Sequence, residues 1–179
     1  MNSFDPATLI PRVAALEAAL ARQDELTRIR RLRERYCRYV DAKRWYELET
    51  ILTAGYRHFS TNDVGAAPTL VADGAKAFRR RLETITAGAT SVHACFMPEI
   101  AFVDEDRARG TWSMTDVVSH PSNATMRFSG RGHYDDEYQR GDDGVWRIAV
   151  TRLTRQRLDP LPLREEARPS GLPSLEDSG

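Results

Sequence analysis

The amino-acid sequence predicts an α+β fold, with helices in the first half of the chain and long strands in the second. Up to about residue 85 the apolar residues recur mainly at three- or four-residue spacing, as on the buried face of a helix. From Ser91 onward β-branched and aromatic residues dominate, and the turn-forming segments DED and GDDG separate the runs. Short connections make neighbouring strands antiparallel. We expect one strongly curved sheet that wraps around the helices and encloses a pocket.

The length and charge of the chain restrict its organisation and its partners. A chain of 179 residues suffices for one domain with a sizeable core. We place this domain over residues 1–158, with an irregular, proline-rich arm over residues 159–179. The 26 basic and 26 acidic residues give no net charge that would attract nucleic acid or an anionic membrane. No apolar run reaches bilayer-spanning length and the N-terminus does not resemble a signal peptide, so we expect a cytoplasmic protein.

Two consecutive apolar patterns precede Asp41. Val13, Leu16 and Leu20 predict an amphipathic leading helix, which either covers the body or pairs with another subunit. The helical spacing then continues at Leu26, Ile29, Leu32, Tyr36 and Val40. The arginines between these positions indicate a solvated helix face, because no aromatic residues alternate with them as in a nucleic-acid platform.

Shorter elements follow the junction at Asp41. Trp45 and Leu48 mark a second helix, and YRHFSTND predicts a first strand that runs into a loop. Residues 62–69 are rich in Gly, Ala and Pro and are expected to be irregular. Asp73 is the predicted cap of a third helix, whose inward residues are Ala75, Phe78, Leu82 and Ile85.

Four long strands are predicted from the segments SVHACFMPEIAFVDED, RARGTWSMTDVVSH, MRFSGRGHYDDEYQRGDDG and VWRIAVTRLTRQR. Pro98 indicates an edge position or a bulge in the first of them. Gly130 and Gly132 would allow bends in a curved sheet. In the last strand Trp146 and Ile148 begin the expected packing face, and a bulge would reverse the two faces further along.

His93 is the most informative of the four histidines, because it enters an otherwise apolar strand. A lone histidine of this kind is more often a core residue bonded to a carbonyl than a catalytic base. Its companions favour chemistry, since the carboxylate of Asp41, the phenol of Tyr36 and the guanidinium of Arg155 each lie at or near the end of an element. From the residues alone, an acid/base site and a structural role both remain open.

Other chemical motifs are missing from the sequence. Cys37 and Cys95 are far apart and fit no CxxC pattern, so we expect buried free thiols rather than a disulfide or a structural zinc site. The chain has no HExxH, HxH, GxGxxG, P-loop or GxSxG pattern. We therefore expect neither a metal site nor a phosphate-binding loop nor a hydrolase elbow.

The order of helices and strands resembles that of the SnoaL-like branch of the nuclear transport factor 2-like superfamily. The same resemblance is carried by the segments RYCRYVDAKRWYELETIL, SVHACFMPEI, GHYDDEYQR and DGVWRIAVTRLTRQR. It extends over residues 14–158, and within the branch the chain is most similar to the bile acid 7-alpha-dehydratase and more distantly to scytalone dehydratase. The resemblance implies a cone-shaped α+β barrel with an apolar interior, and a reaction that uses neither a metal ion nor an organic cofactor.

Carried over position by position, the resemblance implies a catalytic site made of Tyr36, Asp41, His93 and Arg155. His93 would be the general base that removes a proton next to an activated carbonyl, with Asp41 holding its ring. Tyr36 would donate a hydrogen bond to a substrate oxygen, and Arg155 would orient a polar or anionic part of the ligand. Substrate-binding residues are expected at Ser60, Trp112, His133 and Asp135.

The expected function is that of a cofactor-independent lyase, in particular a dehydratase, acting on a hydrophobic steroid-like, polyketide-like or lignin-like molecule. Ser60 replaces a tyrosine of the dehydratases and the second histidine of scytalone dehydratase has no counterpart, so another elimination or an isomerisation stays open. Two alternatives are a non-catalytic ligand-binding or scaffolding subunit, as in the small subunits of ring-hydroxylating dioxygenases, and a ketosteroid-type isomerase with Asp116 or Asp135 as its base. An apolar outer sheet face predicts a homodimer or homotrimer.

Overall fold

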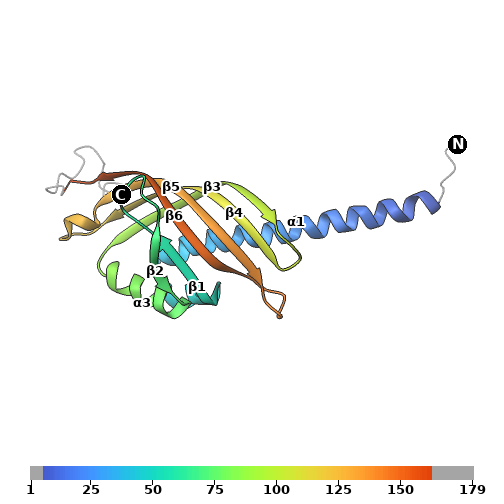
Figure 1. Cartoon of the computed structure of the whole chain (residues 1–179), viewed down its shortest axis with the longest axis horizontal. Coiled ribbons are helices and arrows are strands. Elements are labelled where there is room, and N and C mark those ends of the chain that lie inside the picture. The colour runs from blue at the N-terminus through green and yellow to red at the C-terminus, as the bar shows by residue number, and fades with distance from the viewer. Residues whose placement is uncertain (1–5, 163–179) are drawn as a thin grey trace, which may run out of the picture.

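The computed structural model describes residues 6–162 of the chain (Figure 1). The elements follow in the order α1 (Pro6–Asp41), α2 (Trp45–Thr50), β1 (Leu52–Ser60), β2 (Thr69–Asp73), α3 (Ala75–Ile85), β3 (Thr90–Phe102), β4 (Arg107–Ser119), the 3₁₀ turn η1 (Ala124–Met126), β5 (Phe128–Arg140) and β6 (Trp146–Pro160). The long strands follow the helices, which confirms the predicted α+β fold. The predicted C-terminal arm begins within β6, and its residues 163–179 lie outside the described part of the chain.

Helix α1 is a single helix of 36 residues that unites the two predicted apolar patterns. Its C-terminal half packs beneath the curved sheet, whereas its N-terminal half extends beyond the body (Figure 1). On that extended half four apolar side chains are exposed, namely Ile10, Val13, Leu16 and Leu20. One of the two expectations, that the leading segment covers the body of its own chain, is therefore wrong. No helix within residues 6–162 is long and apolar enough to span a membrane.

The six strands form one mixed sheet in the order β2-β1-β6-β5-β4-β3. Strands β3 to β6 pair antiparallel, as their short connections predict, whereas β1 runs parallel to β6. The sheet curves around α1 (Figure 1) but does not close, because β2 and β3 each pair with one neighbour and not with each other. The cone is thus open along one side, rather than a closed barrel.

Strand β3 confirms the expectation for Pro98. This strand lies at the edge of the sheet, and its register with β4 shifts between Phe96 and Glu99. Met97, directly before the proline, has a φ of 50°, which interrupts the regular strand geometry. A proline lacks the N–H of a regular ladder, so a bulge on an edge strand accommodates it. The regular part of β3 before the bulge carries His93.

The segment before α3 differs from the prediction in two ways. Residues Thr69–Asp73 form strand β2, which pairs antiparallel with β1 and was not expected. Asp73 is the last residue of this strand and does not cap α3; the N-cap is Gly74, and no side chain caps the helix. Gly74 has a φ of 94°, a conformation that glycine adopts at little cost.

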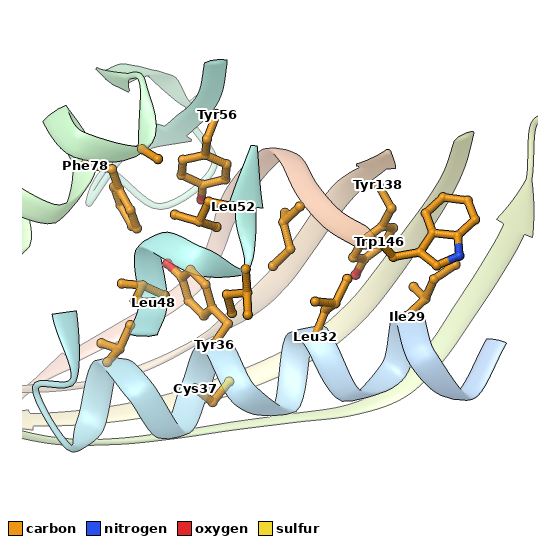
Figure 2. Packing of buried hydrophobic residues seen from close by; sticks show 14 of the residues in the cluster. Ile29, Leu32, Tyr36, Cys37, Leu48, Leu52, Tyr56, Phe78, Tyr138 and Trp146 are labelled. Carbon is orange, nitrogen blue, oxygen red and sulfur yellow. The ribbon is translucent and has the colours of Figure 1, made fainter. Parts of the chain in front are cut away.

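The hydrophobic core lies between α1 and the concave face of the sheet (Figure 2). Its buried members include Ile29, Leu32, Tyr36 and Cys37 of α1, Leu48 of α2, Leu52 and Tyr56 of β1, Phe78 of α3, Tyr138 of β5 and Trp146 of β6. Each large apolar side chain buried in this way stabilises the fold by roughly 1.5–3 kcal/mol. Both cysteines are free thiols, as predicted, yet Cys37 Sγ and Cys95 Sγ lie 3.3 Å apart because α1 packs against β3.

A bulge in β6 decides which side chains face the helices. The register of β5 with β6 shifts between Glu137 and Tyr138, which leaves Ala149 as an extra residue in β6. Ile148 is buried before this point and Arg155 is buried after it, although strict alternation would put them on opposite faces. The reversal expected for this strand is therefore present, and it turns Arg155 towards the interior.

Candidate active site

A cavity of about 320 Å³ lies between α1, α3 and the concave face of the sheet. Its apolar wall includes Val40, Phe78, Leu82, Ile85, Val118, Phe128 and Leu153. Its polar lining includes Tyr36, His58, Ser60, His93, Asp116, Tyr134 and Arg155. Three of the four predicted catalytic residues thus line one cavity, and the fourth, Asp41, is bonded to one of them.

His93 and Asp41 form a hydrogen-bonded pair. Nδ1 of His93 lies 2.6 Å from Oδ1 of Asp41, and the backbone N–H of His93 donates to Oδ2 at 2.8 Å. The hydroxyl of Ser91 also donates to Oδ1, at 2.8 Å. An ionised carboxylate can only accept, so Nδ1 carries the proton and Nε2 of the neutral ring has a free lone pair.

The negative charge on Asp41 is stabilised by its donors. Partial burial acts to raise the pKa of Asp41, but hydrogen bonds from the side chain and backbone of His93, with the bond from Ser91, lower it below its ordinary value. Helix α1 ends at Asp41, and Lys43, with a φ of 57°, turns the chain into α2. The carboxylate therefore lies at a helix end where the chain reverses beside β3.

An ion pair lies beyond the imidazole. Arg155 donates from Nη1 to Oδ1 of Asp116 at 2.8 Å and from Nη2 to Oδ2 at 2.7 Å. Oδ2 of Asp116 lies 3.9 Å from Nε2 of His93. The guanidinium that was expected to orient an anionic ligand is thus bound to a carboxylate of the same chain.

Gly130 provides the space for this ion pair. A Cβ atom at Gly130 would lie 2.2 Å from Nη1 of Arg155 and 2.2 Å from Oδ1 of Asp116. The absence of a side chain therefore lets two strands bring their charged groups together across β5. The sequence predicted only that Gly130 allows a bend in the sheet, and it gave no sign that the residue makes room for an ion pair.

Tyr36 and Tyr134 both pack their rings against the buried guanidinium of Arg33. Cζ of Arg33 is 4.4 Å from the ring centre of Tyr36 and 4.3 Å from that of Tyr134, while its nitrogens bind Asp136 and Thr151 in the core. Burial raises the pKa of Tyr36 more than the charge of Arg33 lowers it, so the phenol keeps its proton at neutral pH. Its hydroxyl has no hydrogen-bond partner among residues 6–162 and can donate to a ligand.

His58 is a cavity residue that the sequence analysis missed. It lies on β1, is only 7% exposed, and lines the same cavity as His93. Its ring stacks on Phe78 with the ring centres 4.6 Å apart, and its Nδ1 lies 2.9 Å from the hydroxyl of Tyr56. Strand alternation already places Tyr56, His58 and Ser60 on one face of β1, but the sequence does not show which face is inward.

Of the four predicted substrate-binding residues, Ser60 lines the cavity and the other three do not. His133 and Asp135 project from the outer face of β5, because Tyr134 between them takes the inward position. Trp112 is buried in an apolar cluster with Met114, Tyr134 and Leu153, but unlike Tyr134 and Leu153 it does not line the cavity.

The arrangement suits base catalysis by His93. One carboxylate binds its Nδ1–H and a second, Asp116, lies near Nε2, so an imidazolium formed there would be stabilised. Asp116 is a less favourable base because both of its oxygens accept from Arg155, and Asp135 lies outside the cavity. Within residues 6–162 no group of three or more His, Cys, Asp and Glu side chains is arranged to hold a metal ion.

Known proteins share this fold. The chain is similar in structure to a proposed scytalone dehydratase from Novosphingobium aromaticivorans, with 19% identity and a TM-score of 0.66 over 80% of this chain and 91% of that one. It is also similar to a type 2 hexachlorocyclohexane dehydrochlorinase, with 17% identity and a TM-score of 0.70 over 85% and 99%. A type 3 dehydrochlorinase from Novosphingobium barchaimii matches with 17% identity and a TM-score of 0.66 over 80% and 94%.

The family is shown by the sequence match rather than by these distant structures. Residues 21–152 match the model of the SnoaL-like domain, which is most of the chain. The resemblance inferred from the sequence is confirmed at this level, while the particular similarity to the bile acid 7-alpha-dehydratase stays a prediction. The chain belongs to the SnoaL-like family of the nuclear transport factor 2-like superfamily.

Proposed function

We propose that the protein is a lyase that eliminates a small group from a hydrophobic cyclic or aromatic molecule by general base catalysis. The observation that carries the proposal is the contact of 2.6 Å between Asp41 and Nδ1 of His93 at the wall of an apolar cavity. Nε2 of His93 removes a proton from a substrate carbon. The electron pair of the broken C–H bond forms a C=C bond as the leaving group departs from the neighbouring carbon.

Asp41 and Asp116 stabilise the imidazolium that this step creates. Asp41 holds the ring in one tautomer and accepts its Nδ1–H, in the manner of a carboxylate that orients a catalytic histidine. Asp116 adds a negative charge 3.9 Å from Nε2. Arg155 holds the carboxylate of Asp116 in place through two hydrogen bonds, so it acts through Asp116 rather than on the ligand.

Tyr36 stabilises the negative charge that develops on the substrate. Its unpartnered hydroxyl lines the cavity and donates a hydrogen bond to an oxygen that becomes negative, or to the leaving group. A departing hydroxyl takes up the proton held by the His93 imidazolium and leaves as water, whereas a departing halogen leaves as halide and the imidazolium returns its proton to the solvent. The names of the structural neighbours, a dehydratase and dehydrochlorinases, cover both outcomes and support elimination as the reaction class.

Self-association of the chain is part of the proposal. Val13, Leu16 and Leu20 form an exposed apolar stripe at three- and four-residue spacing on the extended half of α1. A second copy of the chain would bury this stripe in a homodimer or homotrimer.

The dyad is tested with purified full-length protein and a panel of cyclic β-hydroxy ketones and chlorinated cyclohexanes. Loss of water or hydrogen chloride is followed by mass spectrometry, and carbon deprotonation by deuterium uptake from the solvent. We expect His93→Ala to lower the rate about 100- to 10,000-fold, and Asp41→Asn to lower it as well, because each removes part of the base.

Matched controls come from the outer face of β5. His133→Ala and Asp135→Asn remove the same functional groups outside the cavity, and both variants should keep the parental rate. If folded His93→Ala and Asp41→Asn proteins turn over a substrate at the parental rate, the mechanism is wrong. Ligand binding with neither deuterium uptake nor product, across the panel, would instead favour the non-catalytic binding role.

A further inference from the structure

His58 places a second imidazole in the cavity, on a different wall from the proposed base. His58 comes from β1 and His93 from β3, and these strands lie near opposite edges of the sheet. The proposed elimination makes no use of His58. This side chain is 7% exposed and still lines the cavity, so it is held within the cavity wall.

The hydrogen bond to Tyr56 determines which nitrogen of His58 carries the proton. Tyr56 is fully buried, and this burial raises the pKa of its hydroxyl well above the ordinary value, so the phenol stays protonated. A phenol is a stronger donor than an imidazole N–H, and an imidazole nitrogen is a stronger acceptor than a phenol oxygen. Tyr56 therefore donates to Nδ1 over 2.9 Å, and the single proton of the neutral ring is on Nε2.

Nε2 of His58 is open to the cavity. Among residues 6–162 it has no hydrogen-bond partner. The side-chain nitrogens that are both fully enclosed and unpartnered in this part of the chain belong to Arg33, Arg127 and Arg155, so Nε2 of His58 is accessible from the cavity. Stacking on Phe78 at 4.6 Å and the bond to Tyr56 fix the plane of the ring. The N–H bond thus has one direction in which it can meet a ligand.

The surroundings of His58 keep it neutral. Burial, followed by the positive charges of Arg33 on α1 and Arg81 on α3, lowers the pKa of His58 to about 3. A neutral imidazole can donate a hydrogen bond to an oxygen without transferring its proton to it. His58 therefore differs in kind from His93, whose Nε2 has a free lone pair.

We propose that His58 is a further catalytic residue, which donates a hydrogen bond from Nε2 to a carbonyl oxygen of the substrate. This inference rests on the proposed elimination and names the substrate class as cyclic or aromatic ketones with a leaving group on the β-carbon. His93 removes the proton from the α-carbon, and the electron pair moves onto the carbonyl oxygen as an enolate. His58 and Tyr36 stabilise that charge; the pair then returns to form the C=C bond and expels the leaving group.

The tautomer is measured by nitrogen NMR of the imidazole side chains in uniformly labelled full-length protein. The His58 signals are assigned in the parental protein by through-bond correlation of the ring nitrogens with the backbone amide of His58. We expect a protonated Nε2 and an unprotonated Nδ1 from about pH 8 down to about pH 5, with no titration of this ring in that range. An unprotonated Nε2, or a His58 ring that titrates in this range, would overturn the proposal. This measurement uses the parental protein, so it stands even if His58→Phe folds poorly.

Binding is measured with α-tetralone, an aromatic ketone, and with tetralin, which has the same rings without the oxygen. A neutral hydrogen bond predicts that His58→Phe weakens α-tetralone binding between about 2-fold and about 12-fold and leaves tetralin binding unchanged. Addition of α-tetralone should also shift the Nε2 signal. Equal binding of α-tetralone by the parental protein and a folded His58→Phe variant would contradict the proposal.

Failure of this inference can be told from failure of the proposed lyase activity. The preference for α-tetralone over tetralin should persist in His93→Ala, which lacks the base but keeps His58. A ketone preference that is lost in His58→Phe, in a protein that shows no elimination, would therefore leave the His58 assignment standing and refute the lyase. Elimination without a ketone preference would do the reverse.

Discussion

Gly130→Ala tests whether the Asp116–Arg155 ion pair depends on a missing side chain. Gly130 pairs with Asp116 in the β4–β5 ladder, and an added methyl group would lie 2.2 Å from Nη1 of Arg155 and from Oδ1 of Asp116. Those two atoms are joined by a hydrogen bond of 2.8 Å. The methyl group and the intact ion pair therefore cannot occupy the same space.

The expected loss of stability follows from the burial of the pair. Arg155 and Asp116 are 5% and 2% exposed, so separating them leaves charges that solvent does not compensate. Breaking a buried ion pair costs about 3–5 kcal/mol. Replacing glycine by alanine inside a strand returns roughly 0.5–1 kcal/mol. The net expectation is that the free energy of unfolding falls by about 2–4 kcal/mol.

The assay is equilibrium unfolding in urea, followed by tryptophan fluorescence and far-ultraviolet circular dichroism. Gly55→Ala is the matched control, because Gly55 also lies in a strand and a Cβ atom there would have no neighbour within 4 Å. That variant should be as stable as the parent or slightly more so. If Gly130→Ala unfolds at the same urea concentration as Gly55→Ala, the close packing inferred around Gly130 is wrong.

Two further predictions concern acid stability and assembly. Because the pKa of His58 is about 3 in the folded chain and about 6.5 in the unfolded chain, the unfolded state alone takes up this proton as the pH falls between these values. The free energy of unfolding, measured in urea, should therefore fall by about 3 kcal/mol more in the parental protein than in His58→Phe between pH 7 and pH 4. An equal fall in the two proteins would contradict this prediction. For assembly, light scattering should show that Leu16→Glu with Leu20→Glu reduces a dimer or trimer to a monomer, while Ala18→Glu does not; a monomeric parent would refute self-association.

Much of the fold could be predicted because its signals are local. The helical spacing up to Val40 and the β-rich segments after Ser91 are each set by residues a few positions apart, and their elements appear where expected. Pro98 marks an edge strand because the lack of one N–H restricts where a proline can lie in a sheet. Strand β2 was missed because its five residues follow a Gly- and Pro-rich stretch and carry little pattern of their own.

The candidate site was predictable in part, and the family resemblance supplied most of that part. Asp41 and His93 lie 52 positions apart, and no local pattern predicts that α1 ends beside β3. His133 and Asp135 were predicted to line the pocket. Side chains alternate along β5, and it is Tyr134 between them that faces the cavity, so both point outward. His58 was overlooked for the same reason, since β1 has no alternation strong enough to identify its buried face.

The sequence by itself determined the α+β class, the helix junction at Asp41 and the residue types available for acid/base chemistry, because periodicity and turn preferences act over short distances. The tertiary structure alone decided how those residues are combined. The bulge at Ala149 turns Arg155 inward, the bare backbone at Gly130 admits its pairing with Asp116, and the curvature of the sheet places His58 in the same cavity as His93. These outcomes depend on strand register and on contacts between residues far apart in the chain, and local sequence patterns reveal neither.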